Sequence, residues 1–180
     1  MNSSLISKVE KSRRYADEPE RIRFQRFRVS FAGENGDHVV TMDGTEFTDS
    51  SPSFQSQGTS SHIMALQKIL APMLSEDQQT SGTPFSFSQQ SSGYVSKVEK
   101  ARIYAEEPSR VKFQSFDATL RGSHDEHRVS MNGEDFSCDC HSFDTHGSCA
   151  HVMAMQKVLA EMLTEEQQTA GQPFSFSNAG

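Results

Sequence analysis

The stretch Cys138-Asp139-Cys140-His141-Ser142-Phe143-Asp144-Thr145-His146-Gly147-Ser148-Cys149-Ala150-His151 brings three cysteines and several histidines into one short segment. Positions i and i+2 of an extended strand project to the same side, so Cys138 and Cys140 can hold one ion together. Cys149 and His151 follow after an intervening polar stretch. Three thiolates and an imidazole suit tetrahedral zinc, and four protein donors close its coordination shell. We therefore predict one structural zinc ion per chain, bound by these four residues.

Other interpretations of the segment are weaker but stay open at this point. A Cys138–Cys140 disulfide would be strained by the i, i+2 geometry, and the thiols could also be buried and unconnected. His141 or His146 could replace His151 as the fourth ligand or lie in the outer shell. The chain has 3 cysteines, an odd number, and all lie in this segment, so we expect reduced thiols. We expect a cytoplasmic protein because the sequence has no long apolar run and its first residues do not resemble a signal peptide.

The residues after the cysteines repeat with helical spacing. Apolar side chains recur at intervals of three and four, which predicts a helix with one buried face from about Ala150 to Leu163. Its N-terminus would stabilise the negative charge of the thiolates. Thr164-Glu165-Glu166-Gln167 has the spacing of a capping box and predicts one further turn. An extended apolar strip, Pro173-Phe174-Ser175-Phe176, ends the segment, and it either covers the protein's own sheet or docks a partner.

The residues before the cysteines predict a helix and a β-hairpin. Apolar spacing indicates a helix over 94–107, which Pro108 ends. Strand alternation follows in 111–113 and 116–120, and the change of phase at Gln114-Ser115 predicts a bulge. A turn and a second strand near 127–131 lead back toward Cys138.

The whole pattern occurs twice. Lys8-Val9-Glu10-Lys11 recurs as Lys97-Val98-Glu99-Lys100, and the same shift of 89 positions holds without a gap to the final Pro-Phe-Ser-Phe strips. We therefore predict an α+β protein of two tandem homologous lobes, 1–90 and 91–180. Each lobe would contain a helix, a β-hairpin, a zinc-knuckle-like loop, a second helix and an extended tail.

The pattern C-x-C-(x)n-C-x-H followed by a helix resembles the SWIM zinc finger, and copy 91–180 looks like small bacterial SWIM-type proteins. The resemblance in the motif covers only Cys138 to His151. Members of that family are regarded as zinc modules that bind DNA or protein. What the resemblance implies for this chain is a zinc role for the four residues of the motif.

The first copy departs from the pattern at the ligand positions. Asp49, Ser51 and Ser60 stand where the second copy has its three cysteines, while His62 corresponds to His151. Because serine hydroxyls are poor zinc ligands, we predict a metal-free, degenerate SWIM-like copy. Asp49 and His62 could form a hydrogen bond or a weak metal site. A small lobe without its metal needs other support, so we expect the lobes to pack together, through Ile63, Leu66 and Leu70 against Val152, Met155 and Leu159, or through the Phe85/Phe87 strip.

The sequence points to a binding module. No phosphate-binding loop, nucleophile elbow or His-Glu-x-x-His pair occurs, and we read the glutamates at positions 10, 18, 99 and 107 as solvated charges, so we expect no enzyme activity and no small-molecule substrate. We expect no membrane contact, because the chain has no long apolar run. A net charge of −7 favours a protein partner. The alternative is DNA or RNA binding through the basic residues of the first copy, which are Lys8, Lys11, Arg13, Arg14, Arg21, Arg23, Arg26 and Arg28. A redox or metal-storage role is the weakest hypothesis, because a closed site suppresses thiol reactivity.

Overall fold

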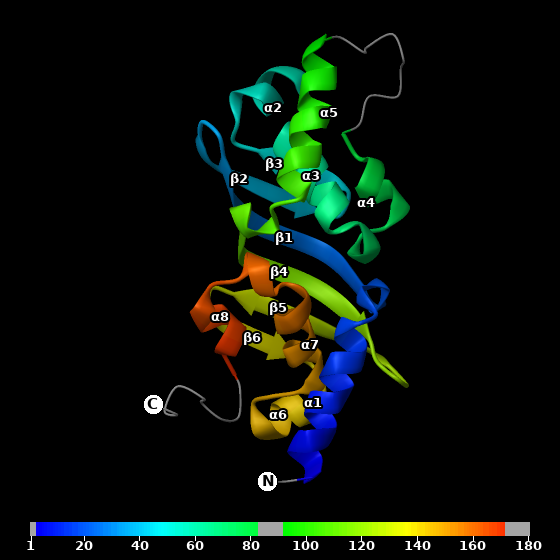
Figure 1. Cartoon of the computed structure of the whole chain (residues 1–180). Coiled ribbons are helices and arrows are strands. Elements are labelled where there is room, and N and C mark those ends of the chain that lie inside the picture. The colour runs from blue at the N-terminus through cyan, green and yellow to red at the C-terminus, as the bar shows by residue number, and fades with distance from the viewer. Residues whose placement is uncertain (1–2, 83–91, 172–180) are drawn as a thin grey trace.

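The computed structural model describes residues 3–82 and 92–171 and combines helices with one antiparallel sheet (Figure 1). The first part contains α1 (Ser3–Ala16), β1 (Ile22–Gly33), β2 (Gly36–Asp43), β3 (Glu46–Asp49), α2 (Pro52–Gln57), α3 (Ser61–Ile69) and α4 (Glu76–Thr80). The second part contains α5 (Ser92–Ala105), β4 (Val111–Arg121), β5 (Glu126–Asn132), β6 (Asp135–Cys138), α6 (His141–His146), α7 (Ala150–Val158) and α8 (Glu165–Thr169). Short 3-10 turns lie at Pro19–Arg21, Ala71–Met73, Pro108–Arg110 and Ala160–Met162. The α+β class is confirmed.

Three local features differ from the sequence-based expectations. Each predicted hairpin is extended by a short third strand, β3 or β6, which ends at the first position of the motif. The polar stretch between the cysteine pairs is helix α6, which Gly147 ends with a left-handed conformation at φ 69°. Helix α7 ends at Val158 and the chain continues as a 3-10 turn, so the predicted helix to Leu163 is two elements. The capping box at Thr164 is present and starts α8 as predicted.

The two copies share a single sheet of order β3-β2-β1-β4-β5-β6. Its centre is the antiparallel pair β1–β4, in which Phe27 pairs with Phe116. These phenylalanines are equivalent under the shift of 89 positions, so the pair relates the copies by an approximate two-fold axis. The sequence predicted two tandem lobes that pack together, and in the structure residues of both copies form one continuous sheet.

Bulges next to this axis bring four phenylalanines onto the same face. The register of β1 against β4 shifts at Gln25 on one strand and at Gln114 on the other, which confirms the predicted bulge. Each shift allows two aromatic residues three positions apart to point inward, where strict alternation would separate them. Phe24 consequently stacks on Phe113 with ring centroids 5.6 Å apart, and both rings are buried. This aromatic cluster ties the copies together at the centre of the sheet.

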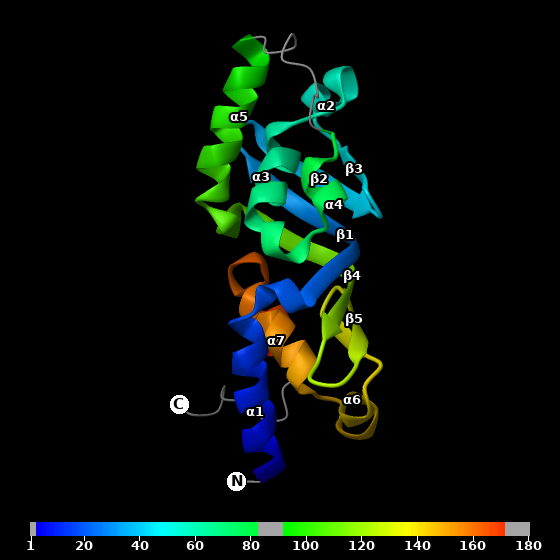
Figure 2. The ribbon, with the colours of Figure 1, turned by 90° about the vertical axis from the view of Figure 1, so that its right-hand side faces the viewer.

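The long helices are exchanged between the copies. Helix α1 of the first copy packs on α7 of the second, and α5 of the second copy packs on α3 of the first. In Figure 2 α1 and α5 lie on the outer side of α7 and α3, away from the strands. The copies thus support each other, but the contacts differ from those predicted. Leu66 and Met155 are buried. The main helical neighbour of α3 and of α7 is the N-terminal helix of the other copy, and not α7 or α3.

Within the described ranges no helix is long and apolar enough to cross a membrane. The strips Pro84–Phe87 and Pro173–Phe176 lie outside those ranges. The two interpretations of these strips, as a cover for the protein's own sheet or as a docking segment for a partner, both stay predictions.

Candidate metal centre

The structure brings the four predicted ligand residues into one buried cluster. One donor atom from each of Cys138, Cys140, Cys149 and His151 lies within 4.8 Å of all the others. Cys138 Sγ is 3.7 Å from His151 Nδ1, which identifies Nδ1 as the nitrogen that faces the thiols. Each of the four residues is no more than 9% exposed. The cluster could therefore hold one metal ion out of contact with bulk water.

Strand and helix ends position the donors. Cys138 is the last residue of β6, and His151 lies in the first turn of α7. Cys140 is the N-cap of α6, where its sulfur accepts a hydrogen bond from the Phe143 amide at 3.4 Å. Cys149 is the N-cap of α7 and accepts from the Val152 amide, also at 3.4 Å. Two sulfurs thus occupy helix N-termini, where backbone N–H groups stabilise negative charge.

The alternatives from the sequence find no support in this arrangement. His141 and His146 lie on the exposed side of α6, where their rings contact Thr145 and the Ser142 carbonyl. The three cysteines are free thiols. The fourth donor of the cluster is His151.

The thiols of Cys138 and Cys140 hold their protons more strongly than an ordinary cysteine. The neighbouring Cys149 thiol, together with burial, raises the pKa of Cys138 to about 12. Burial also raises the pKa of Cys140. Because a metal ion binds the thiolate, it would enter this cluster by displacing protons, as is general for such sites.

The donor set, and the distance between Cys138 Sγ and His151 Nδ1, fit zinc. Bonds of about 2.0–2.3 Å in a tetrahedral zinc site place neighbouring ligand atoms about 3.3–3.8 Å apart. The distance of 3.7 Å between Cys138 Sγ and His151 Nδ1 lies within that range. Three sulfurs and one nitrogen form a closed Cys₃His set, the type found in structural zinc sites.

Contacts around His151 come from both copies. The His127 ring lies 4.5 Å from the His151 ring, and His127 Nδ1 is 3.1 Å from Asp139 Oδ1. Tyr15, from the exchanged helix α1, stacks on His151 with ring centroids 5.8 Å apart and planes 9° apart. The Tyr15 hydroxyl accepts a hydrogen bond from the Ser123 amide at 3.2 Å. The first copy therefore contributes Tyr15 to the packing around His151, the histidine donor of the second copy's cluster.

Sequence reasoning did not identify Tyr15. Its counterpart Tyr104 makes the equivalent stack on His62, with centroids 5.9 Å apart and planes 11° apart. The recurrence of a tyrosine at this place in both copies was visible in the sequence. What it contacts was not, because the partner histidine belongs to the other copy.

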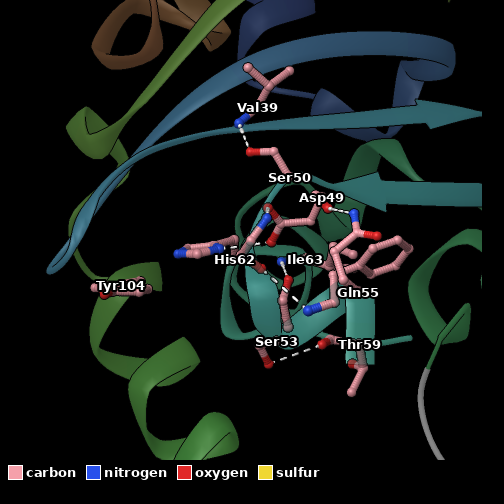
Figure 3. A network of polar contacts seen from close by, with 12 residues as sticks. Val39, Asp49, Ser50, Ser53, Gln55, Thr59, His62, Ile63 and Tyr104 are labelled. Carbon is pink, nitrogen blue, oxygen red and sulfur yellow. Dashed lines mark hydrogen bonds and ion pairs between the residues drawn. The ribbon is translucent and has the colours of Figure 1, made fainter. Parts of the chain in front are cut away.

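The first copy replaces the metal cluster with a hydrogen-bonded network (Figure 3). Asp49 Oδ2 lies 2.8 Å from His62 Nδ1, and Asp49 Oδ1 accepts from the Ser51 amide at 2.9 Å. Ser51 and Ser60 cap α2 and α3, as the cysteines cap α6 and α7. Among the described residues the Cys₃His group is the only cluster of three or more such donors. Of the two interpretations of Asp49 and His62, the structure shows the hydrogen bond.

The charge of Asp49 is stabilised by its partners. Burial raises the pKa of this carboxyl, but hydrogen bonds from His62, Ser60 and the Ser51 amide outweigh burial, and the pKa falls below its ordinary value of 3.8. A carboxyl whose pKa is lowered by folding stabilises the folded state above its unfolded pKa. That contribution disappears as the pH falls through the lower, folded pKa.

We expect Asp49→Asn to lower the free energy of unfolding by about 1–3 kcal/mol at neutral pH, because buried donors lose a charged acceptor. The difference from wild type should persist down to about pH 4 and shrink as the pH falls further, since the unfolded wild-type chain takes up a proton at Asp49 before the folded chain does. Urea unfolding followed by circular dichroism at several pH values measures both effects. A difference that stayed constant down to pH 2 would contradict the assignment of a stabilising charge to Asp49.

Two of the four glutamates that the sequence suggested as solvated charges bond to arginines. Glu18 pairs with Arg21, and Glu107 pairs with Arg110.

Comparisons with protein families, with characterised proteins and with solved structures find no significant match to the chain.

Proposed function

We propose that this chain is a zinc-stabilised, non-catalytic binding module that serves as a protein-interaction adaptor or accessory subunit of a larger assembly. The observation that carries the proposal is the buried Cys₃His cluster, in which four protein donors can fill a tetrahedral shell. A site of this kind leaves no coordination position for a substrate or a reactive water. The motif resembles the SWIM zinc finger, which agrees with a zinc-binding module. We also propose that the protein works in the cytoplasm, where reducing conditions keep its thiols free.

The zinc content tests the metal assignment directly. Purified protein should contain close to one zinc ion per chain, because only the second copy has a complete ligand set. Elemental analysis after dialysis measures the ratio. A ratio of two would show that the first copy also binds metal, and a ratio near zero would overturn the zinc proposal.

The arginines of the first copy support a protein partner over nucleic acid. Arg21 and Arg23 donate to the carbonyls of Arg121 and Pro72. Arg26 lies 3.5 Å from Asp117 in an ion pair, and Arg28 donates to Gln114. These four cations are thus already engaged within the chain, which weakens the case for a continuous phosphate-binding surface.

The open face of the sheet is the surface that we propose for the partner. A shallow hollow of about 710 Å³ lies over its central strands, with Arg26 and Arg28 beside Asp43 and Asp117. Alternating charges of this kind suit a protein surface better than a uniformly negative nucleic acid. The bulky substitution Ser130→Arg in the hollow should abolish co-purification of the partner from the source cell. The same change at the exposed Gln57 of α2 serves as control.

Nucleic-acid binding is the second candidate function. Fluorescence anisotropy with random duplex DNA and with single-stranded RNA, measured over a range of salt concentrations, separates it from the first. Binding that weakens steeply with salt would favour nucleic acid.

A further inference from the structure

A cleft of about 440 Å³ lies where the first copy has Ser51 and Ser60 in place of two cysteines of the second copy. One wall is the start of α3 with Ser60 and Ser61, together with Ser51. The opposite wall is α5, which comes from the second copy and contributes Lys97 and Lys100. The cleft therefore lies between the two copies, and neither copy forms it alone.

Lys97 lacks a counter-charge in this cleft. Its ammonium nitrogen is sheltered from solvent and has no hydrogen-bond partner in the part of the chain that the structure describes. A cation that is removed from water without a partner is costly, and burial accordingly lowers the pKa of Lys97. The unpaired ammonium points to a ligand that would supply negative charge.

The acidic groups of the cleft and its floor already have other partners. Glu34 lies 3.4 Å from the ammonium of Lys100, one turn further along α5. Asp49, beneath the cleft, is bonded to His62 and to the Ser51 amide and is only 2% exposed. Both carboxylates are thus committed elsewhere, and the charge of Lys97 remains to be balanced.

The facing wall offers hydrogen-bond donors. Ser60 caps α3 by accepting from the Ile63 amide. The amides of the first two helical residues, Ser61 and His62, have no carbonyl partner within a helix, and the helix dipole directs positive charge toward the cleft. The second copy has Ala150 in place of Ser61 and cysteines in place of Ser51 and Ser60. The first copy therefore has hydroxyls at the places where the second copy has thiols and a methyl group.

We propose that this cleft binds a phosphate group, with the Lys97 ammonium opposite the hydroxyls of Ser51 and Ser61 and the first amides of α3. Its volume exceeds that of a lone phosphate ion, so the natural ligand carries the phosphate on a larger group, such as a phosphorylated side chain of the partner. The first copy would then have a ligand site at the place where the second copy has its metal site. This inference goes beyond the proposed adaptor function and does not require zinc in the first copy.

The test is a titration of the zinc-loaded full chain with inorganic phosphate, followed by ¹H–¹⁵N NMR. We expect saturable shifts at the amides of Ser61, His62 and Lys97. Lys97→Gln should weaken binding at least about tenfold, since a charge-assisted bond is lost. Lys8→Gln, at the equivalent position on α1, which packs on α7 of the zinc-binding copy, should leave the affinity unchanged.

A phosphoserine peptide and its unphosphorylated form extend the titration to a carrier of the group. Tighter binding of the phosphopeptide than of inorganic phosphate supports a phosphorylated partner. Equal affinities for the phosphopeptide and for inorganic phosphate assign the site to the free ion. The proposal would be overturned if neither inorganic phosphate nor the phosphopeptide gave saturable shifts. It would also be overturned if Lys97→Gln and Lys8→Gln weakened phosphate binding equally. Zinc content of both variants is expected to match wild type. Lys97→Gln is expected to melt at or above the wild-type temperature, because the ligand-free protein no longer buries an unpaired ammonium. These two measurements keep this outcome distinct from failure of the metal proposal.

Discussion

The variant Cys149→Ser is expected to lose its zinc and to unfold with a free energy lower by several kcal/mol, on the order of the whole stability margin of a small domain. The substitution removes one thiolate but keeps the helix cap, because a serine already caps the equivalent helix: Ser60 Oγ accepts from the Ile63 amide at 3.2 Å. The loss would therefore report on the metal and not on the cap. Thermal melting followed by circular dichroism, combined with elemental analysis, measures both changes.

A matched triple variant distinguishes loss of metal from general damage. Cys138→Asp, Cys140→Ser and Cys149→Ser together give the second copy the ligand-position residues of the first, with His151 as the counterpart of His62. We expect this protein to bind no zinc and yet to melt above Cys149→Ser, because an aspartate–histidine hydrogen bond would replace the cluster, as it does between Asp49 and His62. A melt of Cys149→Ser that matched wild type would show that the site is not structural.

Separating the copies is expected to have an equally large effect. The fragments 1–90 and 91–180 each lose a central strand partner and the helix that covers their buried helix. The complete ligand set of 91–180, taken by itself, predicts that this fragment folds with zinc. The structure changes this expectation, because Tyr15 and the rest of α1 would be missing from α7.

We expect 91–180 to form a homodimer that binds two zinc ions. The β1–β4 pairing is nearly symmetric: Ile22 pairs with Leu120, and Phe31 pairs with Val111 at the equivalent place. Two β4 strands can therefore pair in the same way while the α5 helices are exchanged. Fragment 1–90, which lacks a metal site, should be poorly ordered alone, and mixing the fragments should yield a one-to-one complex with one zinc.

Analytical ultracentrifugation of each fragment and of the mixture gives the masses, and NMR gives the order. A monomeric 91–180 that unfolds cooperatively with zinc would show that the exchanged helix is dispensable. A well-dispersed spectrum of 1–90 alone would show that the Asp49 network suffices without the second copy.

The sequence by itself determined the local chemistry of this protein. The spacing of three cysteines and His151 identified the donors that the fold brings together. The phase change at Gln114 predicted a bulge, and Thr164 to Gln167 predicted a capping box, because both depend on residues close along the chain. The replacement of cysteines by Asp49, Ser51 and Ser60 likewise predicted a copy without metal.

Only the tertiary structure decided which copy supports which. Helices α1 and α5 have similar sequences, so their apolar spacing does not reveal whether each covers its own copy or the other. That choice follows from the pairing of β1 with β4, which joins residues about 90 positions apart and places each preceding helix over the opposite half of the sheet. The stacking of Tyr15 on His151 and the cleft around Lys97 both arise from this exchange, and neither is visible in one copy alone.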